Sequence, residues 1–263
     1  MSAGTPETWL LDLGNSRAKV ARLEAGAPAD AFALEWGAPG FAADLQARLA
    51  RWPRPARVWV ASVASLAHAQ AVRAVLATFA PARAEWLRTP RCAGGVTNRY
   101  ARPERLGIDR FLAMLAAHAR ARGACIIVGC GTALTLDAVG AGGDHVEGLI
   151  TLAPDGMLRA LQGATAIADG NPDAFAAGAR DDTALALHAG CWASAGALVE
   201  WFVARQQAGG AGRQAWLHGG WAARLAAWLA RDGCQVQVLD NAVLRGLAAW
   251  AGAANVESSA DLR

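Results

Sequence analysis

The first candidate for chemistry is a polar run near the N-terminus with the pattern Asp-x-Gly-Asn-Ser-x-x-Lys, residues 12–19. Apolar residues precede it and an alternating segment follows it, so we expect a β-hairpin with this run at its tip. There the Asp12 carboxylate can hold hydrated magnesium, backbone amides can face phosphate oxygens, and Lys19 can add a point charge. The run also fits an ordinary hairpin, so alone it leaves a phosphate loop and a plain turn both open.

A second run, Gly-Thr-Ala-x-Thr-x-Asp at residues 131–137, repeats this arrangement. It is a glycine turn with hydroxyl groups, set between an apolar segment at 124–128 and an alternating segment at 134–139. The pattern of the N-terminal hairpin therefore restarts in the middle of the chain. Two such loops in tandem α/β halves resemble the layout of the actin-like, sugar-kinase and heat-shock ATPase superfamily, in which each half contributes one loop to the phosphates of ATP.

A third run, residues 95–110, has the pattern Gly-Val-x-Asn-x-Tyr-x-x-Pro-x-x-Leu-Gly-x-Asp-Arg. Its last two residues, Asp109 and Arg110, fall at the expected start of a helix. A carboxylate there can act as a base, and the adjacent guanidinium can bind an acidic substrate. An Asp-Arg pair at a helix start is also common as a solvated ion pair. The interpretation as a base and a substrate-binding group therefore depends on the rest of the pattern.

The elements that must position these runs alternate between strands and helices. The hydrophobic spacing predicts strands at 9–13, 18–23, 58–62, 124–128, 134–139, 148–152, 215–218 and 236–239, and helices at 41–50, 67–79 and 183–207 and from residues 108, 221 and 243 onward. Residues 89–105 form a long expected loop. We therefore predict two α/β lobes with a central cleft, residues 1–118 and 119–263.

Composition excludes several classes of protein. Of the 263 residues, 54% are hydrophobic and are spread along the chain, which is enough for a continuous core. No apolar run reaches the roughly 20 residues of a membrane span, and the polar N-terminus does not resemble a secretion signal. The five cysteines include no CxxC pair, so we expect neither a disulfide framework nor a zinc site, and a reducing cytoplasm fits best.

Charge and rare residues narrow the choice further. A formal net charge of +3 is too small and too evenly spread for a nucleic-acid surface. Lys19 is the only lysine and Tyr100 the only tyrosine, and both lie within the runs described above. Because this composition contains no other Lys or Tyr, Lys19 and Tyr100 are candidates for tasks that Arg or Phe cannot perform.

With its three runs in this order, the chain resembles the type III pantothenate kinases, including the members described as Bvg accessory factors. The resemblance extends from Asp12 to about Gly246, and residues 95–110 are its most specific part. It implies a duplicated actin-like ATPase fold (ASKHA, ribonuclease H-like). It also implies ATP-dependent phosphorylation of pantothenate to 4′-phosphopantothenate, the first step of coenzyme A biosynthesis, by a homodimer. From composition and charge we expect a cytoplasmic protein that binds neither nucleic acid nor membrane.

The resemblance also implies roles for individual residues. The first ATP phosphate loop would comprise Asp12, Leu13, Gly14, Asn15, Ser16, Arg17, Ala18 and Lys19, with Asp12 holding Mg²⁺ through water. Gly131 and Thr132 would contact ATP from the second loop, and Gly219 and Gly220 would lie near the adenosine. Pantothenate would be held by Tyr100, Gly107, Ile108, Asp109 and Arg110, with Asp109 accepting the hydroxyl proton. Arg110 would hold either the pantothenate carboxylate or the transferred phosphoryl group, and Thr183 would reach substrate across a dimer interface.

Two positions depart from the family pattern. Most members have an Asp two residues before the second Gly-Thr, where it binds a monovalent cation, K⁺ or NH₄⁺; this chain has Gly129. The cation site is therefore in question. The family segment Gly-Gly-x-Ile-x-Pro-Gly is replaced by residues 147–153, which changes the expected turn there.

Two rival functions stay open at this point. One is a regulatory or nucleotide-binding protein that kept the fold but lost most of its catalysis, which the two departures would support. The other is an actin-like phosphotransferase or phosphatase for a different small acidic molecule. The five histidines lack paired metal-ligand spacing and are interpreted as structural, and no Gly-x-Ser-x-Gly elbow is present.

Overall fold

The computed structural model describes residues 6–79, 84–166, 182–208 and 214–260. The chain divides into two compact units, residues 1–119 with 241–263, and residues 120–240. Each unit contains one five-stranded mixed sheet, and the strand order is the same in both. Within the described ranges, no helix is long and apolar enough to cross a membrane.

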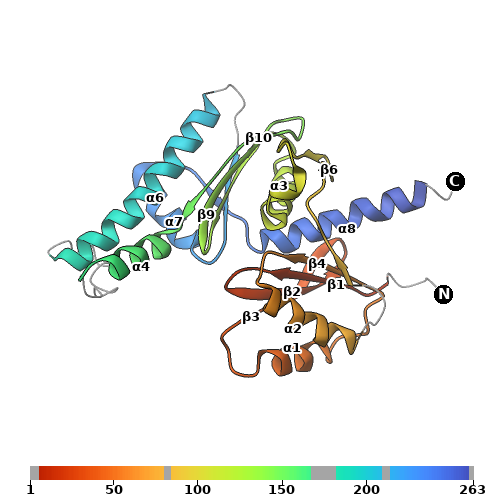
Figure 1. Cartoon of the computed structure of the whole chain (residues 1–263). Helices are drawn as coiled ribbons and strands as arrows, with labels where there is room; N and C mark the ends of the chain where they lie inside the picture. The colour runs from red at the N-terminus through yellow and green to blue at the C-terminus, as the bar shows by residue number, and fades with distance from the viewer. Residues whose placement is uncertain (1–5, 80–83, 167–181, 209–213, 261–263) are drawn as a thin grey trace. The chain divides into compact units, whose positions relative to one another are not determined.

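The first unit is built on a sheet with the order β3-β2-β1-β4-β5 (Figure 1). Its strands are β1 (Thr8–Leu13), β2 (Arg17–Glu24), β3 (Ala27–Glu35), β4 (Arg57–Ser62) and β5 (Ala84–Trp86). β1 runs antiparallel to β2 and parallel to β4, and all six of its residues are buried. The tip of the β1–β2 hairpin, which carries the first polar run, is therefore fixed to the centre of the sheet.

Helices cover both faces of this sheet. Trp9, Leu11 and Leu13 point to one face, where they pack against α1 (Phe41–Leu49) and α2 (Leu66–Ala77). The alternate residues of β1 point to the opposite face, because side chains alternate along a strand. The C-terminal helix α8 (Ala242–Ala260) contacts β1, β2, β3 and β4 and lies on the other side of the sheet from α1 and α2 (Figure 1).

The placement of α8 corrects the expected division of the chain. We assigned residues 119–263 to one lobe, but residues 241–263 belong to the first unit. Gly246 explains how the contact is made: a β-carbon there would collide with the backbone carbonyl of Leu112 in α3 (Ile108–Ala121). The rings of Phe111 and Trp250 also meet edge to face, 6.4 Å apart. Nothing in the linear pattern distinguishes this long-range packing from packing on the preceding unit.

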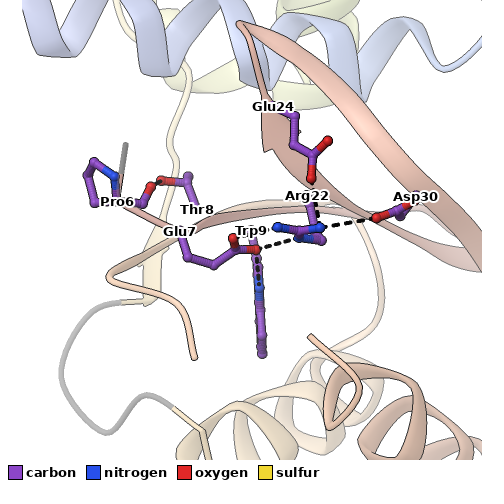
Figure 2. A network of polar contacts seen from close by, with 7 residues as sticks. All are labelled: Pro6, Glu7, Thr8, Trp9, Arg22, Glu24 and Asp30. Atoms are coloured by element: carbon purple, nitrogen blue, oxygen red, sulfur yellow. Dashed lines mark hydrogen bonds and ion pairs between the residues drawn. The ribbon is translucent and has the colours of Figure 1, made fainter. Parts of the chain in front are cut away.

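β3 was not expected from the sequence, because it is an edge strand with few buried side chains and contains a proline. Polar contacts help to hold it (Figure 2). The Arg22 guanidinium on β2 forms a bidentate pair with Glu7, at 2.7 and 2.8 Å, and also contacts Glu24 at 2.7 Å and Asp30 of β3 at 3.3 Å. These contacts link the first three strands at the end opposite the hairpin tip.

The second unit has the equivalent sheet order β10-β9-β8-β11-β12. Its strands are β8 (Cys125–Cys130), β9 (Ala133–Val139), β10 (His145–Leu152), β11 (Gln214–His218) and β12 (Gln237–Val238). One face packs against α6 (Thr183–Gln207) and α7 (Ala222–Leu229) through an apolar cluster that includes Val128, Leu136 and Phe202. α4 (Pro154–Ala164) follows β10 directly.

The remaining elements are short. β6 (Cys92–Ala93) and β7 (Val96–Thr97) form a small hairpin in the expected long loop, and η1 (Pro103–Arg105) is a single 3₁₀ turn before α3. A second 3₁₀ turn, η2 (Ala230–Asp232), follows α7.

Candidate functional site

The tip of the β1–β2 hairpin places an acidic and a basic group side by side. Asp12 and Lys19 are register partners on the two strands, and Asp12 is only 9% exposed. The turn closes with the Gly14 amide donating to the Arg17 carbonyl at 3.1 Å, while Asn15 and Ser16 are exposed. The turn therefore leaves Asn15 and Ser16 at the surface next to the buried Asp12.

The ionisation of Asp12 is strongly affected by its surroundings. Burial raises the pKa of this carboxyl to about 7; the Lys19 ammonium acts in the lowering direction, and the Asp109 carboxylate raises the pKa further. The last effect requires Asp109 to lie near Asp12, so the structure brings together two runs that are far apart in the sequence. A positive charge near these two carboxylates would be favoured, because it would stabilise their ionised forms.

The third run, residues 95–110, forms a braced loop in the structure. Asn98 is fully buried; its amide donates to the Pro103 carbonyl at 3.0 Å, and its side-chain oxygen accepts from the Tyr100 amide at 3.0 Å. Arg91 adds three bonds to loop carbonyls, of Asn98 at 2.9 Å, Tyr100 at 2.7 Å and Ala101 at 3.1 Å. Asn98 therefore shapes the loop that presents Tyr100.

Two of these bracing residues were missed by the sequence analysis. Arg91 holds the loop as described, and the buried Thr89 hydroxyl donates to the Leu106 carbonyl at 2.6 Å. Both lie upstream of the run in the expected loop, where a lone Arg or Thr has no spacing that marks it as structural. Only the folded loop shows that its carbonyls converge on these side chains.

The end of the loop orients the proposed base. Asp109 lies in the first turn of α3, and its Oδ1 accepts a bond from the Arg110 amide at 2.8 Å. A β-carbon added to Gly107 would lie 2.6 Å from the same Oδ1, so glycine at 107 leaves the space that this carboxylate uses. Arg110 Nη1 donates to the Tyr100 hydroxyl at 3.3 Å. Tyr100, Asp109 and Arg110 therefore form one polar cluster, while Ile108 between them is buried.

The second unit presents two glycine turns side by side. Gly131 and Thr132 link β8 to β9, and Gly219 and Gly220 follow β11, which is the parallel neighbour of β8. Gly219 has a φ of 103°, and a β-carbon there would collide with the Cys130 carbonyl. The structure therefore brings together the sequence-predicted second phosphate loop and the predicted adenosine segment.

Residues 147–153, which depart from the family pattern, lead into a helix that lies beside the loop of Gly131 and Thr132. β10 continues to Leu152, Ala153 is buried, and α4 begins at Pro154. A β-carbon on Gly156 would lie 3.6 Å from the Thr132 carbonyl, so the first turn of α4 lies against the second loop. The expected turn at residues 147–153 is thus a strand end that passes directly into a helix.

The surroundings of Gly129 bear on whether this position could take part in binding a monovalent cation. A β-carbon at this position would lie 2.6 Å from Thr135 Oγ1 and 2.9 Å from His218 Nε2. Thr135 and His218 are its register partners on the two neighbouring strands. They fill the space that a carboxylate at residue 129 would need, so the residues present do not fit a monovalent cation held there. Among the described residues, no group of three or more acidic, His or Cys side chains forms a metal site.

Thr183 begins α6, with Asp182 as the cap: the Asp182 carboxylate accepts from the Leu185 amide at 2.7 Å. Thr183 is exposed. Its neighbour thus has the expected capping role, and the expected role of Thr183 at a dimer interface stays a prediction.

Comparison with solved structures shows which fold the chain has. Component A of the (R)-2-hydroxyglutaryl-CoA dehydratase of Acidaminococcus fermentans aligns with a TM-score of 0.57 at 12% identity, covering 97% of this chain and 100% of that one. The activator of the 2-hydroxyisocaproyl-CoA dehydratase of Clostridium difficile, solved with bound ADPNP, aligns with a TM-score of 0.54 at 15% identity, covering 97% of both chains. With the two sheets of equal order, these likenesses confirm the duplicated actin-like fold.

The particular family follows from the sequence comparisons. The family model for type III pantothenate kinase matches residues 9–205. The type III pantothenate kinase of Xylella fastidiosa strain M23 is 38% identical over 255 residues, which cover 94% of this chain and 99% of that protein. The chain belongs to the type III pantothenate kinase family, as the resemblance indicated.

Proposed function

We propose that this protein transfers the γ-phosphoryl group of ATP to pantothenate, forming 4′-phosphopantothenate and so beginning coenzyme A synthesis. Membership of the type III pantothenate kinase family supports this reaction. The observation that carries the proposal is that Asp109 lies near enough to Asp12 for its charge to raise the pKa of Asp12, so the substrate run and the first phosphate loop lie in the same part of the first unit. The regulatory alternative gains no support from these residues, which are all retained in a braced arrangement.

Asp109 is the proposed proton acceptor. Phosphoryl transfer depends mainly on positioning and charge neutralisation, so one base aimed at the attacking hydroxyl is sufficient. The Arg110 amide and the space above Gly107 fix the direction of the Asp109 carboxylate. The proton of the primary hydroxyl passes to an Asp109 oxygen as the new O–P bond forms and the bond to the β-phosphate oxygen breaks.

Tyr100 and Arg110 are the proposed pantothenate-binding groups. The Arg110 guanidinium donates to the Tyr100 hydroxyl, so the two side chains share one surface. Because a guanidinium binds a carboxylate through two parallel bonds, Arg110 is suited to the pantothenate carboxylate. The contact with Tyr100 favours this role for Arg110 over a role at the transferred phosphoryl group.

Asp12 is the proposed Mg²⁺ residue, bound through water. Burial beside Asp109 makes a second positive charge near Asp12 favourable, since Lys19 alone leaves its pKa high. Bound Mg²⁺ would neutralise phosphate charge during transfer. The proposed ATP-binding residues are residues 12–19 of the first unit and Gly131, Thr132, Gly219 and Gly220 of the second. We propose no monovalent cation, because Gly129 lacks both a ligand and the space for one.

Two further expectations belong to this proposal. A homodimer with Thr183 at the shared site follows from the family resemblance, and Thr183 is exposed as that role requires. A cytoplasmic location agrees with the free thiols of all five cysteines and with ATP as substrate.

The test is ATP-dependent formation of 4′-phosphopantothenate by the purified protein with Mg²⁺, followed by mass spectrometry. Product that appears only when pantothenate is present establishes the kinase. Nucleotide binding without product would favour the regulatory alternative. Phosphorylation of another acidic small molecule, unaffected by competing pantothenate, would favour the second rival.

A further inference from the structure

The first phosphate loop is held from outside by a residue that neither the sequence analysis nor the comparisons assign. Trp36 follows β3, and its indole Nε1 donates a hydrogen bond of 2.9 Å to the Gly14 carbonyl, 22 residues away. The Trp36 backbone amide also donates to the Ser16 carbonyl, at 3.4 Å. One residue therefore binds two carbonyl groups of a three-residue turn.

These two bonds affect the amide groups that are proposed to face phosphate. In a trans peptide group, the carbonyl of one residue and the N–H of the next point in opposite directions within one plane. Because Trp36 binds the Gly14 carbonyl, the Asn15 N–H is turned to the side of the loop away from Trp36. A backbone amide turned outward at an exposed turn is the donor that a phosphate-binding loop needs.

The indole of Trp36 is itself fixed by aromatic packing. It stacks on the His68 ring, with centroids 4.4 Å apart and planes at 6°, and contacts the Phe41 ring at 4.8 Å. His68 lies in the first turn of α2, where its amide donates to the Ser65 cap at 3.2 Å. The loop is thereby connected through Trp36 to the starts of α1 and α2, which are rigid parts of the first unit.

We propose that Trp36 is a positioning residue for ATP: its indole N–H sets the direction of the loop amides that bind the phosphates. The proposal rests on the proposed function in that the ligand of this loop is the polyphosphate of ATP. Trp36 acts through the Gly14 carbonyl and does not touch the nucleotide. Its loss affects the nucleotide and leaves pantothenate binding unchanged, since the braces of residues 95–110 are independent of it.

The chain offers a matched pair of substitutions. Trp36→Phe keeps an aromatic ring against His68 and removes the N–H that binds Gly14. Trp59→Phe is the control: Trp59 is a buried residue of β4 in the same unit, and its Nε1 has no hydrogen-bond partner in the part of the chain that the structure describes. Both changes replace indole by phenyl, but only the first removes a bond to the loop.

The measurement compares the KM for ATP and the KM for pantothenate, together with the affinity for AMPPNP by calorimetry. In Trp36→Phe the KM for ATP and the AMPPNP dissociation constant rise by about three- to tenfold, as expected for the loss of one neutral hydrogen bond. The KM of Trp36→Phe for pantothenate stays within about twofold of the wild type. In Trp59→Phe the KM for ATP and the AMPPNP dissociation constant also stay within about twofold of the wild type. His68→Ala, which removes the stacking partner and keeps the N–H, gives a smaller loss of nucleotide affinity.

Three results would overturn the proposal. The first is unchanged nucleotide affinity in a folded Trp36→Phe protein. The second is an equal rise of both KM values, which would indicate general loosening of the unit. The third is a wild-type protein that binds no nucleotide. If the wild type binds AMPPNP but does not phosphorylate pantothenate, only the proposed reaction fails, and the AMPPNP comparison still decides the role of Trp36.

Discussion

The two hairpins that carry the proposed phosphate loops have the same backbone plan but different chemistry. In each unit the central strand is followed by a glycine turn, at Gly14 and Gly131. Two residues before the glycine stand Asp12 in the first unit and Gly129 in the second. Their partners on the adjacent antiparallel strands are Lys19 and Thr135.

The parallel neighbours complete two three-residue rows. Asp12 is flanked by Ala61 on β4, and Gly129 is flanked by His218 on β11. In the first unit the central residue, Asp12, carries a carboxylate and its parallel neighbour Ala61 is small. In the second unit the central residue, Gly129, has no side chain, and Thr135 and His218 occupy the space above it. The duplication thus preserves the positions, while at this point of the row the carboxylate of Asp12 in the first unit is replaced by Gly129 in the second.

The largest expected effect is at Asp109, the proposed base, which lies near the row formed by Lys19, Asp12 and Ala61 (the charged row). Asp109→Asn keeps the size of the side chain and its acceptor for the Arg110 amide, but it cannot take the hydroxyl proton. We expect kcat to fall by roughly 10²- to 10⁴-fold with little change in Tm. Steady-state kinetics and thermal unfolding check this. Asp44→Asn, at an exposed ion pair in α1, is the matched control; normal turnover in Asp109→Asn would remove the base role.

Asp12→Asn tests the charged row itself and has two opposite effects. Turnover should fall by roughly a hundredfold or more, because the phosphates lose the group that is proposed to hold Mg²⁺. At alkaline pH, the free Asp12→Asn protein should be more stable than the free wild-type protein. The pKa of Asp12 is about 7 in the folded state against 3.8 ordinarily, so its favourable contribution is present at acidic pH and is lost as the pH rises from about 4 to 7.

An Asn side chain does not ionise, so the variant avoids that loss. The Tm difference between Asp12→Asn and the wild type should therefore be small near pH 4 and should grow in favour of the variant up to pH 8. Unfolding scans across this range, without Mg²⁺, measure it. A variant that is less stable than the wild type at every pH would show that Lys19 already compensates the Asp12 charge.

Gly129→Ala tests the uncharged row. The added methyl group meets Thr135 Oγ1 at 2.6 Å and His218 Nε2 at 2.9 Å, so we expect a loss of roughly 1–3 kcal/mol in the free energy of unfolding. Gly131→Ala is the matched control, since a β-carbon there has nothing within 4 Å. Denaturant titration of both variants measures the contrast. Equal stability of Gly129→Ala and the wild type would mean that the second row has room for a side chain.

Much of this architecture follows from the sequence. Alternating hydrophobicity and glycine turns identified both hairpins, and the pattern at residues 95–110 identified the loop that carries Asp109. The pattern does not show β3, whose side chains are mostly exposed, or the packing of α8 on the first unit, which depends on close approach at Gly246. Arg91 and Trp36 were missed for a related reason: both act on backbone carbonyls, and a sequence does not show where carbonyls converge.

The smallest expected effect is the change in turnover and AMPPNP affinity with the monovalent cation present, and it tests directly whether the two rows differ in cation binding. With no carboxylate in the second row, K⁺ and NH₄⁺ have no charged ligand at residue 129, and His218 and Thr135 hold the space. Turnover with Mg²⁺ and AMPPNP affinity should therefore agree within about twofold between KCl, NH₄Cl and tetramethylammonium chloride at equal ionic strength, where screening is the same. Removing Mg²⁺ with a chelator should abolish turnover in all three salts, because the first row keeps its carboxylate. Strong stimulation by K⁺ alone would mean that other residues build a cation site, and the two rows would then differ in their ligands without differing in their chemistry.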